Sequence, residues 1–208
     1  MRILYIDTSS SYLYTAISED NKLVSQIKKE FGQSLSEEAL PEIVSMFNEN
    51  NLSAKDTDKI IVIDGPGSLT GIRIGITIAK VYAWSLNIPI TTITSLEAMM
   101  LSSNSNTYKV PLIDARRRYV FGAIYDKDNN VVLKPQHITI DNLKIELEKL
   151  EDYTIISNNE FDDFSDTENY DPDIMKIINY FKDKESINPH AVNPDYLKLT
   201  EAEESKLS

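Results

Sequence analysis

Residues 60–86 read IIVIDGPGSLTGIRIGITIAKVYAWSL, and this stretch decides the fold. The apolar run at its start is typical of a short buried strand, and Gly65-Pro66-Gly67-Ser68 then turns the chain. The segment from Thr70 to Leu86 is predicted to be a long helix. The glycine spacing fits neither a P-loop nor a GxGxxG motif. The turn is therefore either a tight connection between strand and helix, capped by Ser68 or Thr70, or a binding site for an anion at the helix N-terminus.

The predicted helix is unusual because small residues recur at every fourth position. These residues are Gly71, Gly75, Ala79 and Ala83. Such a stripe lets another backbone approach closely, which offsets the cost of about 1 kcal/mol for each glycine. Arg73 and Lys80 are its only charged residues, and they share a face with Thr77 and Trp84. Either the helix is sandwiched within the monomer, or it lies between its own sheet and a partner protein. We adopt the second interpretation as the working hypothesis.

The same succession of elements is predicted twice along the chain. In the first half, strands over residues 2–7, 11–18 and 23–27 precede a helix, the strand 59–64 and the long helix. Ser34 and Glu37 fit a capping box for the first of these helices. In the second half, strands 110–114, 119–125 and 131–138 precede a helix at 141–150 capped by Asp141, a strand at 153–157 and a helix at 173–181. This repeated βββαβα order predicts two α/β lobes with mixed sheets, over residues 1–102 and 103–208.

Composition excludes several classes of site. The 208 residues include 33 acidic and 21 basic side chains, a net charge of −12, and nearly all of the excess acid follows residue 140. Such a chain is a poor autonomous binder of nucleic acid. It has no Cys and only His137 and His190, which argues against thiolate or histidine metal sites and a Cys nucleophile. No apolar run approaches the roughly 18 residues of a membrane span, and residues 1–7 do not resemble a signal peptide, so we expect a cytoplasmic protein.

Several motifs together resemble the TsaB (YeaZ) family. They are Ile6-Asp7-Thr8-Ser9, Leu40-Pro41-Glu42-Ile43, the run from Gly65 to Gly75, Thr94-Ser95-Leu96-Glu97-Ala98, Ile113-Asp114-Ala115-Arg116-Arg117 and, more weakly, Asn193-Pro194-Asp195-Tyr196-Leu197. The resemblance implies an actin/sugar-kinase/Hsp70-like fold, abbreviated ASKHA, of duplicated lobes. It also implies a part in making threonylcarbamoyladenosine, the modified base beside the anticodon of tRNAs that read codons starting with A.

Within that family the chain is expected to be an activating subunit. The resemblance implies that it binds the catalytic paralogue TsaD, that the ATPase TsaE joins the assembly, and that tRNA is bound only through the complex. ATP and metal are then expected on the partner subunits, with no cofactor here, and a homodimer can form when TsaD is absent. The family is also grouped with glycoprotease-like peptidases, but peptidase activity is not expected.

The residues themselves favour a non-catalytic role. TsaD-type chains carry an HxxxH metal pair on the first helix, and residues 33–42 contain no His. Asp7 matches the phosphate-strand acid of ATP-hydrolysing relatives, but Thr8 follows it where those proteins have Gly, so Asp7 is interpreted as a structural acid. We predict no catalytic residue and no metal ligand. The rival hypotheses are an ATP-dependent small-molecule kinase of the same fold and a metallopeptidase.

The partner interface is predicted on the two helices of the first lobe. We expect them to pack against the matching helices of TsaD, or of a second copy, and to bury at least about 1,600 Å². The predicted interface residues are Leu40, Ile43, Phe47, Arg73, Thr77 and Lys80.

One basic cluster, Asp114-Ala115-Arg116-Arg117-Arg118, is predicted at a hairpin turn. It is either a solvated turn in which Asp114 pairs with an arginine, or a contact for tRNA phosphate or an acidic partner. Three arginines alone give weak, salt-sensitive binding.

Overall fold

The computed structural model describes residues 1–197, which form two compact units. The first unit contains Met1–Ser95 and Pro172–Asp195, and the second contains Leu96–Asp171. The chain therefore divides differently from the predicted lobes 1–102 and 103–208. The helix at residues 174–181 was expected in the second lobe, but it packs on the sheet of the first unit.

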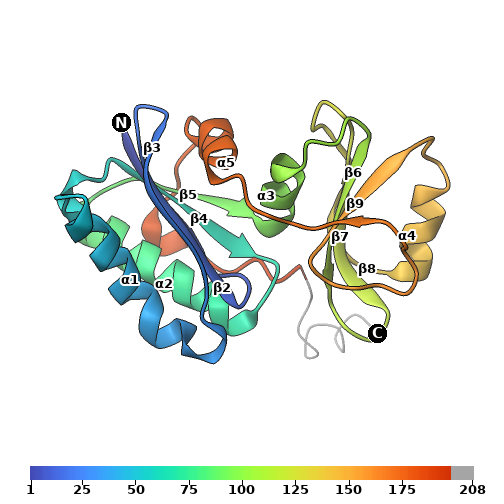
Figure 1. The fold of residues 1–208 in the computed structure, drawn as a ribbon, viewed down its shortest axis with the longest axis horizontal. Helices are drawn as coiled ribbons and strands as arrows, with labels where there is room; N and C mark the ends of the chain where they lie inside the picture. Colours follow the sequence, from blue (N-terminus) through green and yellow to red (C-terminus); the bar gives the residue numbers. More distant parts are fainter. Residues whose placement is uncertain (198–208) are drawn as a thin grey trace. The chain divides into compact units, whose positions relative to one another are not determined.

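The first unit is built on a five-stranded mixed sheet (Figure 1). Its strand order is β3-β2-β1-β4-β5, with β1 antiparallel to β2 and parallel to β4. The central strands are nearly all apolar because both faces of the sheet are covered. The strands are β1 (Arg2–Asp7), β2 (Tyr12–Glu19), β3 (Lys22–Glu30), β4 (Lys59–Gly65) and β5 (Ile90–Thr94).

Three helices cover the two faces of this sheet. Helices α1 (Leu35–Glu49) and α2 (Leu69–Leu86) lie side by side on one face, and α5 (Ile174–Phe181) lies on the other against β1 and β2 (Figure 1). Side chains of β1 alternate between the two faces, so Leu4 and Ile6 pack with α1 and α2 in the main core cluster.

The second unit repeats the strand order of the first. Its sheet runs β10-β9-β6-β7-β8, again with an antiparallel hairpin pair and parallel neighbours. Helix α4 packs on this sheet through Leu143 and Leu147. The elements are α3 (Ser95–Ser102), β6 (Tyr108–Asp114), β7 (Tyr119–Tyr125), β8 (Val131–Thr139), α4 (Ile140–Leu147), β9 (Tyr153–Ile156) and β10 (Thr167–Glu168).

The predicted fold class is confirmed, while two predicted caps are wrong. The Ser34 hydroxyl donates to the Phe31 carbonyl instead of capping α1, because a short 3-10 turn precedes the helix. Helix α4 is capped by Thr139, whose Oγ1 accepts from the Asn142 amide, and not by Asp141. Within residues 1–197, no helix has the length and hydropathy needed to cross a membrane.

Candidate functional site

The stripe of small residues on α2 packs against the end of the chain's own β1 strand and against Thr8, the residue that follows it. A Cβ added at Gly71 would overlap the backbone carbonyl oxygen of Thr8, and one added at Gly75 would overlap the Thr8 hydroxyl. The Thr8 hydroxyl also donates to the Gly71 carbonyl at 2.7 Å. Ala79 and Ala83 continue the stripe into the hydrophobic core. The close approach that the stripe permits is therefore made inside the monomer.

The Gly-Pro-Gly turn is held by backbone contacts from two other segments. Gly65 and Gly67 have φ angles of +129° and +156°, which side-chain-bearing residues rarely adopt. The Ser68 amide donates to the Ser9 carbonyl at 2.7 Å, and the Asp195 amide donates to the Asp64 carbonyl at 2.8 Å. The Ser68 hydroxyl accepts from the Gly71 amide, which confirms the predicted tight, capped connection between strand and helix.

Asp7 lies at the end of β1 with a side chain that is 2% exposed. Its Oδ1 accepts from the Ser9 amide at 2.8 Å and from the Ser9 hydroxyl at 2.7 Å. Burial raises the pKa of Asp7, and the bonds from Ser9 oppose that rise. The carboxyl group therefore organises the loop that follows β1. Among the described residues, no group of three or more His, Cys, Asp or Glu side chains could hold a metal ion.

The predicted interface residues fall into three groups. Leu40, Arg73 and Thr77 are exposed on the sides of α1 and α2 that face away from the sheet. Lys80 is half-buried, and its Nζ donates to the Val192 carbonyl at 2.8 Å, so it fixes the C-terminal segment to α2.

Ile43 and Phe47 are not surface residues, and this part of the interface prediction is corrected. Ile43 is 0% exposed and Phe47 3% exposed, and both belong to the main core cluster. Helix α1 has two apolar sides, and the sheet takes the one that carries Ile43, Met46 and Phe47. The other side carries Leu40 and Val44, which remain exposed.

The predicted interface left out several exposed apolar residues on the same two helices. Trp84 is 65% exposed, and Leu69 and Val81 are also exposed. The sequence had already placed Trp84 on the face of Thr77, and one step of four residues from Thr77 leads to Val81, so helical periodicity could have added both. We define the outer face of α1 and α2 as Leu40, Val44, Leu69, Arg73, Thr77, Val81 and Trp84.

The basic cluster forms the turn between β6 and β7, but its ion pairs differ from the prediction. Asp114 does not pair with a guanidinium; its Oδ1 accepts from the Arg116 backbone amide at 2.8 Å. Arg118 instead forms ion pairs with Asp141 at 2.9 Å and with Asp163 at 3.2 Å. The contact from Lys144, followed by the one from Arg118, lowers the pKa of Asp163.

Two mixed sheets of the same strand order define the class as an α/β protein with the ASKHA-like fold. A solved Pseudomonas aeruginosa protein described as similar to peptidase YEAZ has a TM-score of 0.78 at 17% identity, over 95% of this chain and 99% of that one. YeaZ from the same organism has a TM-score of 0.72 at 16% identity, over 94% and 99% of the two chains.

Sequence comparisons narrow this class to one family. Residues 23–173 match the family model "TsaD: tRNA N6-adenosine threonylcarbamoyltransferase". The tRNA threonylcarbamoyladenosine biosynthesis protein TsaB of Bacillus subtilis is 33% identical over 98% of this chain and 96% of its own length. TsaB of Escherichia coli is 30% identical over 65% of this chain and 64% of its own. The chain belongs to the TsaB (YeaZ) family.

Proposed function

We propose that this chain is a non-catalytic activating subunit in the biosynthesis of threonylcarbamoyladenosine in tRNA. In this proposal it binds a TsaD-like catalytic paralogue in the cytoplasm, and a TsaE-like ATPase joins the pair. The catalytic subunit then transfers threonylcarbamoyl to the adenosine beside the anticodon. The names of the relatives supply the pathway, and the exposed outer face of α1 and α2 is the observation that carries the role as a binding subunit.

The outer face has the character of a helix-packing interface. Its apolar members come from two neighbouring helices whose other sides are already buried against the sheet. An exposed Trp next to aliphatic residues is typical of a binding hot spot. Two helices from a partner, packed ridges into grooves on this face, would complete a helical bundle.

The segment where ASKHA relatives act on nucleotides is occupied here by internal contacts. Backbone groups of Ser9 and Asp195 contact the Gly-Pro-Gly turn. The amide and hydroxyl of Ser9 both donate to the Asp7 carboxylate. These contacts support a structural part for the turn. In this proposal, ATP and metal are held by the partner subunits.

The binding step can be tested with charge substitutions on the outer face. Val81→Glu combined with Trp84→Glu should weaken binding to the TsaD of the same organism by at least about 30-fold, since a charge would be buried at the interface. Ile145→Glu is the matched control, because Ile145 is a similarly exposed apolar residue, 55% exposed, on α4 of the second unit. Size-exclusion chromatography with light scattering reports the complex, and circular dichroism checks the fold.

The activating role needs a reconstituted reaction. The chain, TsaD and TsaE are mixed with tRNA, threonine, bicarbonate and ATP, and modified nucleosides are measured by mass spectrometry. Omission of this chain should abolish the product, and the Val81→Glu/Trp84→Glu variant should behave like the omission. Normal product from the variant would contradict the proposed surface. ATP turnover by the chain alone, lost in Asp7→Ala, would instead favour a kinase.

The same surface can pair with a second copy of the chain. We expect the wild-type chain alone to form a homodimer and the Val81→Glu/Trp84→Glu variant to be a monomer. Addition of TsaD should convert the wild-type homodimer into the heterodimer. A homodimer that survives in the double variant would show that self-association uses another surface.

A further inference from the structure

The turn between β6 and β7 holds three consecutive arginines in the left-handed conformation. The φ angles of Arg116, Arg117 and Arg118 are 66°, 53° and 62°. Residues with a Cβ adopt this region at a cost of roughly 1–2 kcal/mol each. The Tyr119 amide donates to the Arg116 carbonyl at 3.0 Å, and the Ala115 amide donates to the Tyr119 carbonyl at 3.0 Å. With the bond to Asp114, these contacts give the turn one defined shape.

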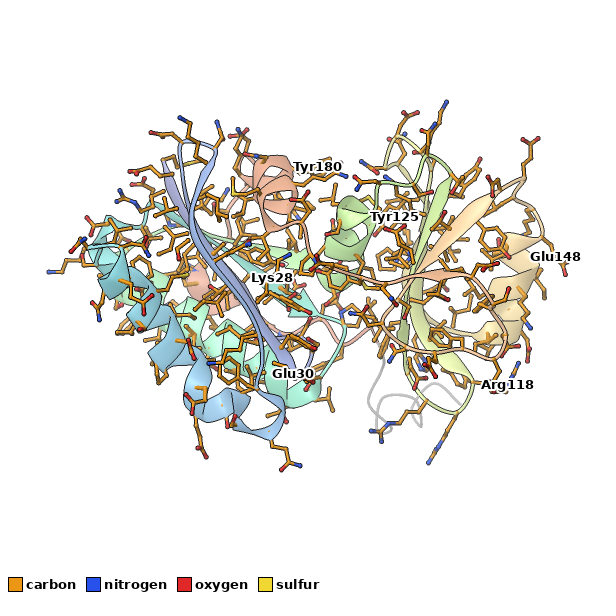
Figure 2. All side chains as sticks on the ribbon, in the orientation of Figure 1. Lys28, Glu30, Arg118, Tyr125, Glu148 and Tyr180 are labelled. Carbon is orange, nitrogen blue, oxygen red and sulfur yellow. The ribbon has the colours of Figure 1, made fainter. Side chains whose placement is uncertain are left out.

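The three guanidinium groups have different surroundings. Arg118 is fixed by Asp141 and Asp163, and Figure 2 shows it at the end of the hairpin beside α4. Arg116 and Arg117 are exposed, and within residues 1–197 neither makes an ion pair. Asp141 and Asp163 therefore neutralise Arg118, while the guanidinium groups of Arg116 and Arg117 remain exposed to a ligand on a backbone of defined shape.

Aromatic rings follow the three arginines along the chain. Tyr119 is 39% exposed and stacks on His137, with ring centroids 4.5 Å apart and planes within 6°. Phe121 packs against the same imidazole at 5.3 Å. Because His137 lies on the neighbouring strand β8, opposite Phe121, the sheet holds the exposed tyrosine ring in one orientation.

We propose that this turn binds a single-stranded segment of RNA, with Arg116 and Arg117 contacting phosphates and Tyr119 stacking against a base. Guanidinium groups recognise phosphate oxygens, and an exposed flat ring accepts the face of any base. An acidic peptide would use the arginines but would leave the tyrosine without a role. The inference rests on the proposed function in one respect: a tRNA is the RNA that the assembly would bring here.

The surrounding charge sets the expected strength of this contact. Acidic residues outnumber basic ones in Leu96–Asp171, so phosphate attraction is confined to the turn. We therefore expect weak binding by the isolated chain that falls steeply with salt, and a positioning contribution within the assembly.

The arginines are tested by the salt dependence of RNA binding. The probe is a fluorescein-labelled 12-nucleotide oligouridylate, and anisotropy gives the affinity of the full chain between about 20 and 200 mM KCl. Arg116→Glu with Arg117→Glu should reduce the slope of log affinity against log salt by about 1.4, since each single-strand phosphate contact contributes about 0.7. Lys127→Glu with Lys134→Glu, an exposed pair on the same unit, is the matched control and should leave the slope unchanged.

The ring is tested separately. Tyr119→Ala should weaken binding about 5- to 100-fold without changing the slope, and Tyr119→Phe should retain the affinity. Equal slopes for the two charge-reversed pairs, or no binding by the wild-type chain at 20 mM KCl, would overturn the proposal. Displacement by oligoglutamate in the absence of RNA binding would assign the turn to an acidic protein. Binding to TsaD should be unaffected by Arg116→Glu/Arg117→Glu, so failure here is distinct from failure of the proposed function.

Discussion

The two units share a strand order, but they connect their last two strands differently. In the first unit, β4 leads to β5 through the 18-residue helix α2. In the second unit, residues 157–166 carry the chain from β9 to the two-residue strand β10 without an α-helix. Phe161 and Phe164 of that connection pack against the core cluster of the second unit.

This difference indicates which parts of α2 the fold requires. In the second unit, the helix-free connection 157–166 places Phe161 and Phe164 against the core and returns the chain to the sheet at β10. A helix is therefore not required to join these two strands. The inner side of α2 contributes to the core of the first unit with Ile72, Ile76 and its small stripe. The outer side of α2 adds nothing to either core and has no counterpart among the described residues of the second unit. The predictions below test this division in order of their expected effect on stability.

The largest effect is expected at Gly71. Gly71→Ala should lower the free energy of unfolding by about 3 kcal/mol or more, since the new Cβ would overlap the backbone carbonyl of Thr8. Gly122→Ala on β7 is the control in the second unit. There the Cβ would lie 2.8 Å from the end of the Leu112 side chain, which can rotate away, so a loss near 1 kcal/mol is expected. Urea unfolding measures both.

Thr8 allows this packing to be dissected further. Gly75→Ala should be partly rescued by Thr8→Ala, because the obstacle at Gly75 is the Thr8 hydroxyl, whereas Gly71→Ala should not be rescued. A double-mutant cycle gives the two coupling energies. Equal coupling at both positions would show that α2 shifts as a body, contrary to the separate contacts described here.

A smaller loss is expected when the anchor of α5 is removed. Lys59 at the start of β4 is buried, and its Nζ donates to the carbonyls of Lys182 and Lys184, both at 2.7 Å. Lys59→Met should lower the free energy of unfolding by about 1–3 kcal/mol, because two partly buried carbonyls lose a charged donor. Lys55→Met, at an exposed position, should change it by less than about 0.5 kcal/mol. Hydrogen exchange should show faster opening of α5 in Lys59→Met alone.

The placement of α5 shows where sequence reasoning reaches its limit. The apolar spacing of Ile174, Ile177 and Phe181 correctly predicted a helix with one buried side. That spacing does not say against which of the two sheets the apolar side of the helix packs. The chain ends the short strand β10 at Glu168 and returns to the first unit from Pro172 onward. The strand-turn-helix at residues 60–86 was predictable because glycine and apolar runs act locally.

The candidate surface was only partly predictable for a related reason. Helix α1 presents apolar residues on two sides, and the pattern alone does not say that Ile43 faces the sheet while Val44 faces away. The left-handed arginines could not be foreseen either, since glycine or asparagine is the usual signal for that conformation. Tertiary contacts from Asp141 and Asp163 help to fix that turn.

The pH dependence of stability should differ in sign between Asp7 in the first unit and Asp163 in the second. Burial raises the pKa of Asp7 above 3.8, so its contribution to stability declines as pH rises from 3.8 through the raised value. Asp7→Asn should therefore remove that decline, and Oδ1 of the amide can still accept from Ser9.

Ion pairs lower the pKa of Asp163, so its contribution to stability is present above the ordinary pKa of 3.8 and is lost as pH falls through the lowered value. Asp163→Asn should therefore be less stable than the parent at neutral pH and equal to it in strong acid, as measured by unfolding between pH 2 and 8.

The smallest change in stability is expected at Trp84. The ring is 65% exposed and meets the His190 ring edge-on, with centroids 6.2 Å apart. Trp84→Ser should change the free energy of unfolding by less than about 0.5 kcal/mol, because little apolar area leaves the core. The same substitution should weaken TsaD binding by about 30-fold if the ring anchors the interface.

The free energy of unfolding and the affinity for TsaD, measured separately, show whether the outer side of α2 serves binding. A residue that the fold needs lowers stability and binding together, as expected for Gly71→Ala. A residue that only the partner needs lowers binding alone. A loss of more than about 1 kcal/mol in the free energy of unfolding of Trp84→Ser would show that the fold itself needs the ring. In that case it would hold the 3-10 turn Pro189–Ala191 against α2, together with the bond from Lys80 to Val192. Lys80→Met measures that structural contribution independently, because it removes the bond and leaves the exposed ring in place.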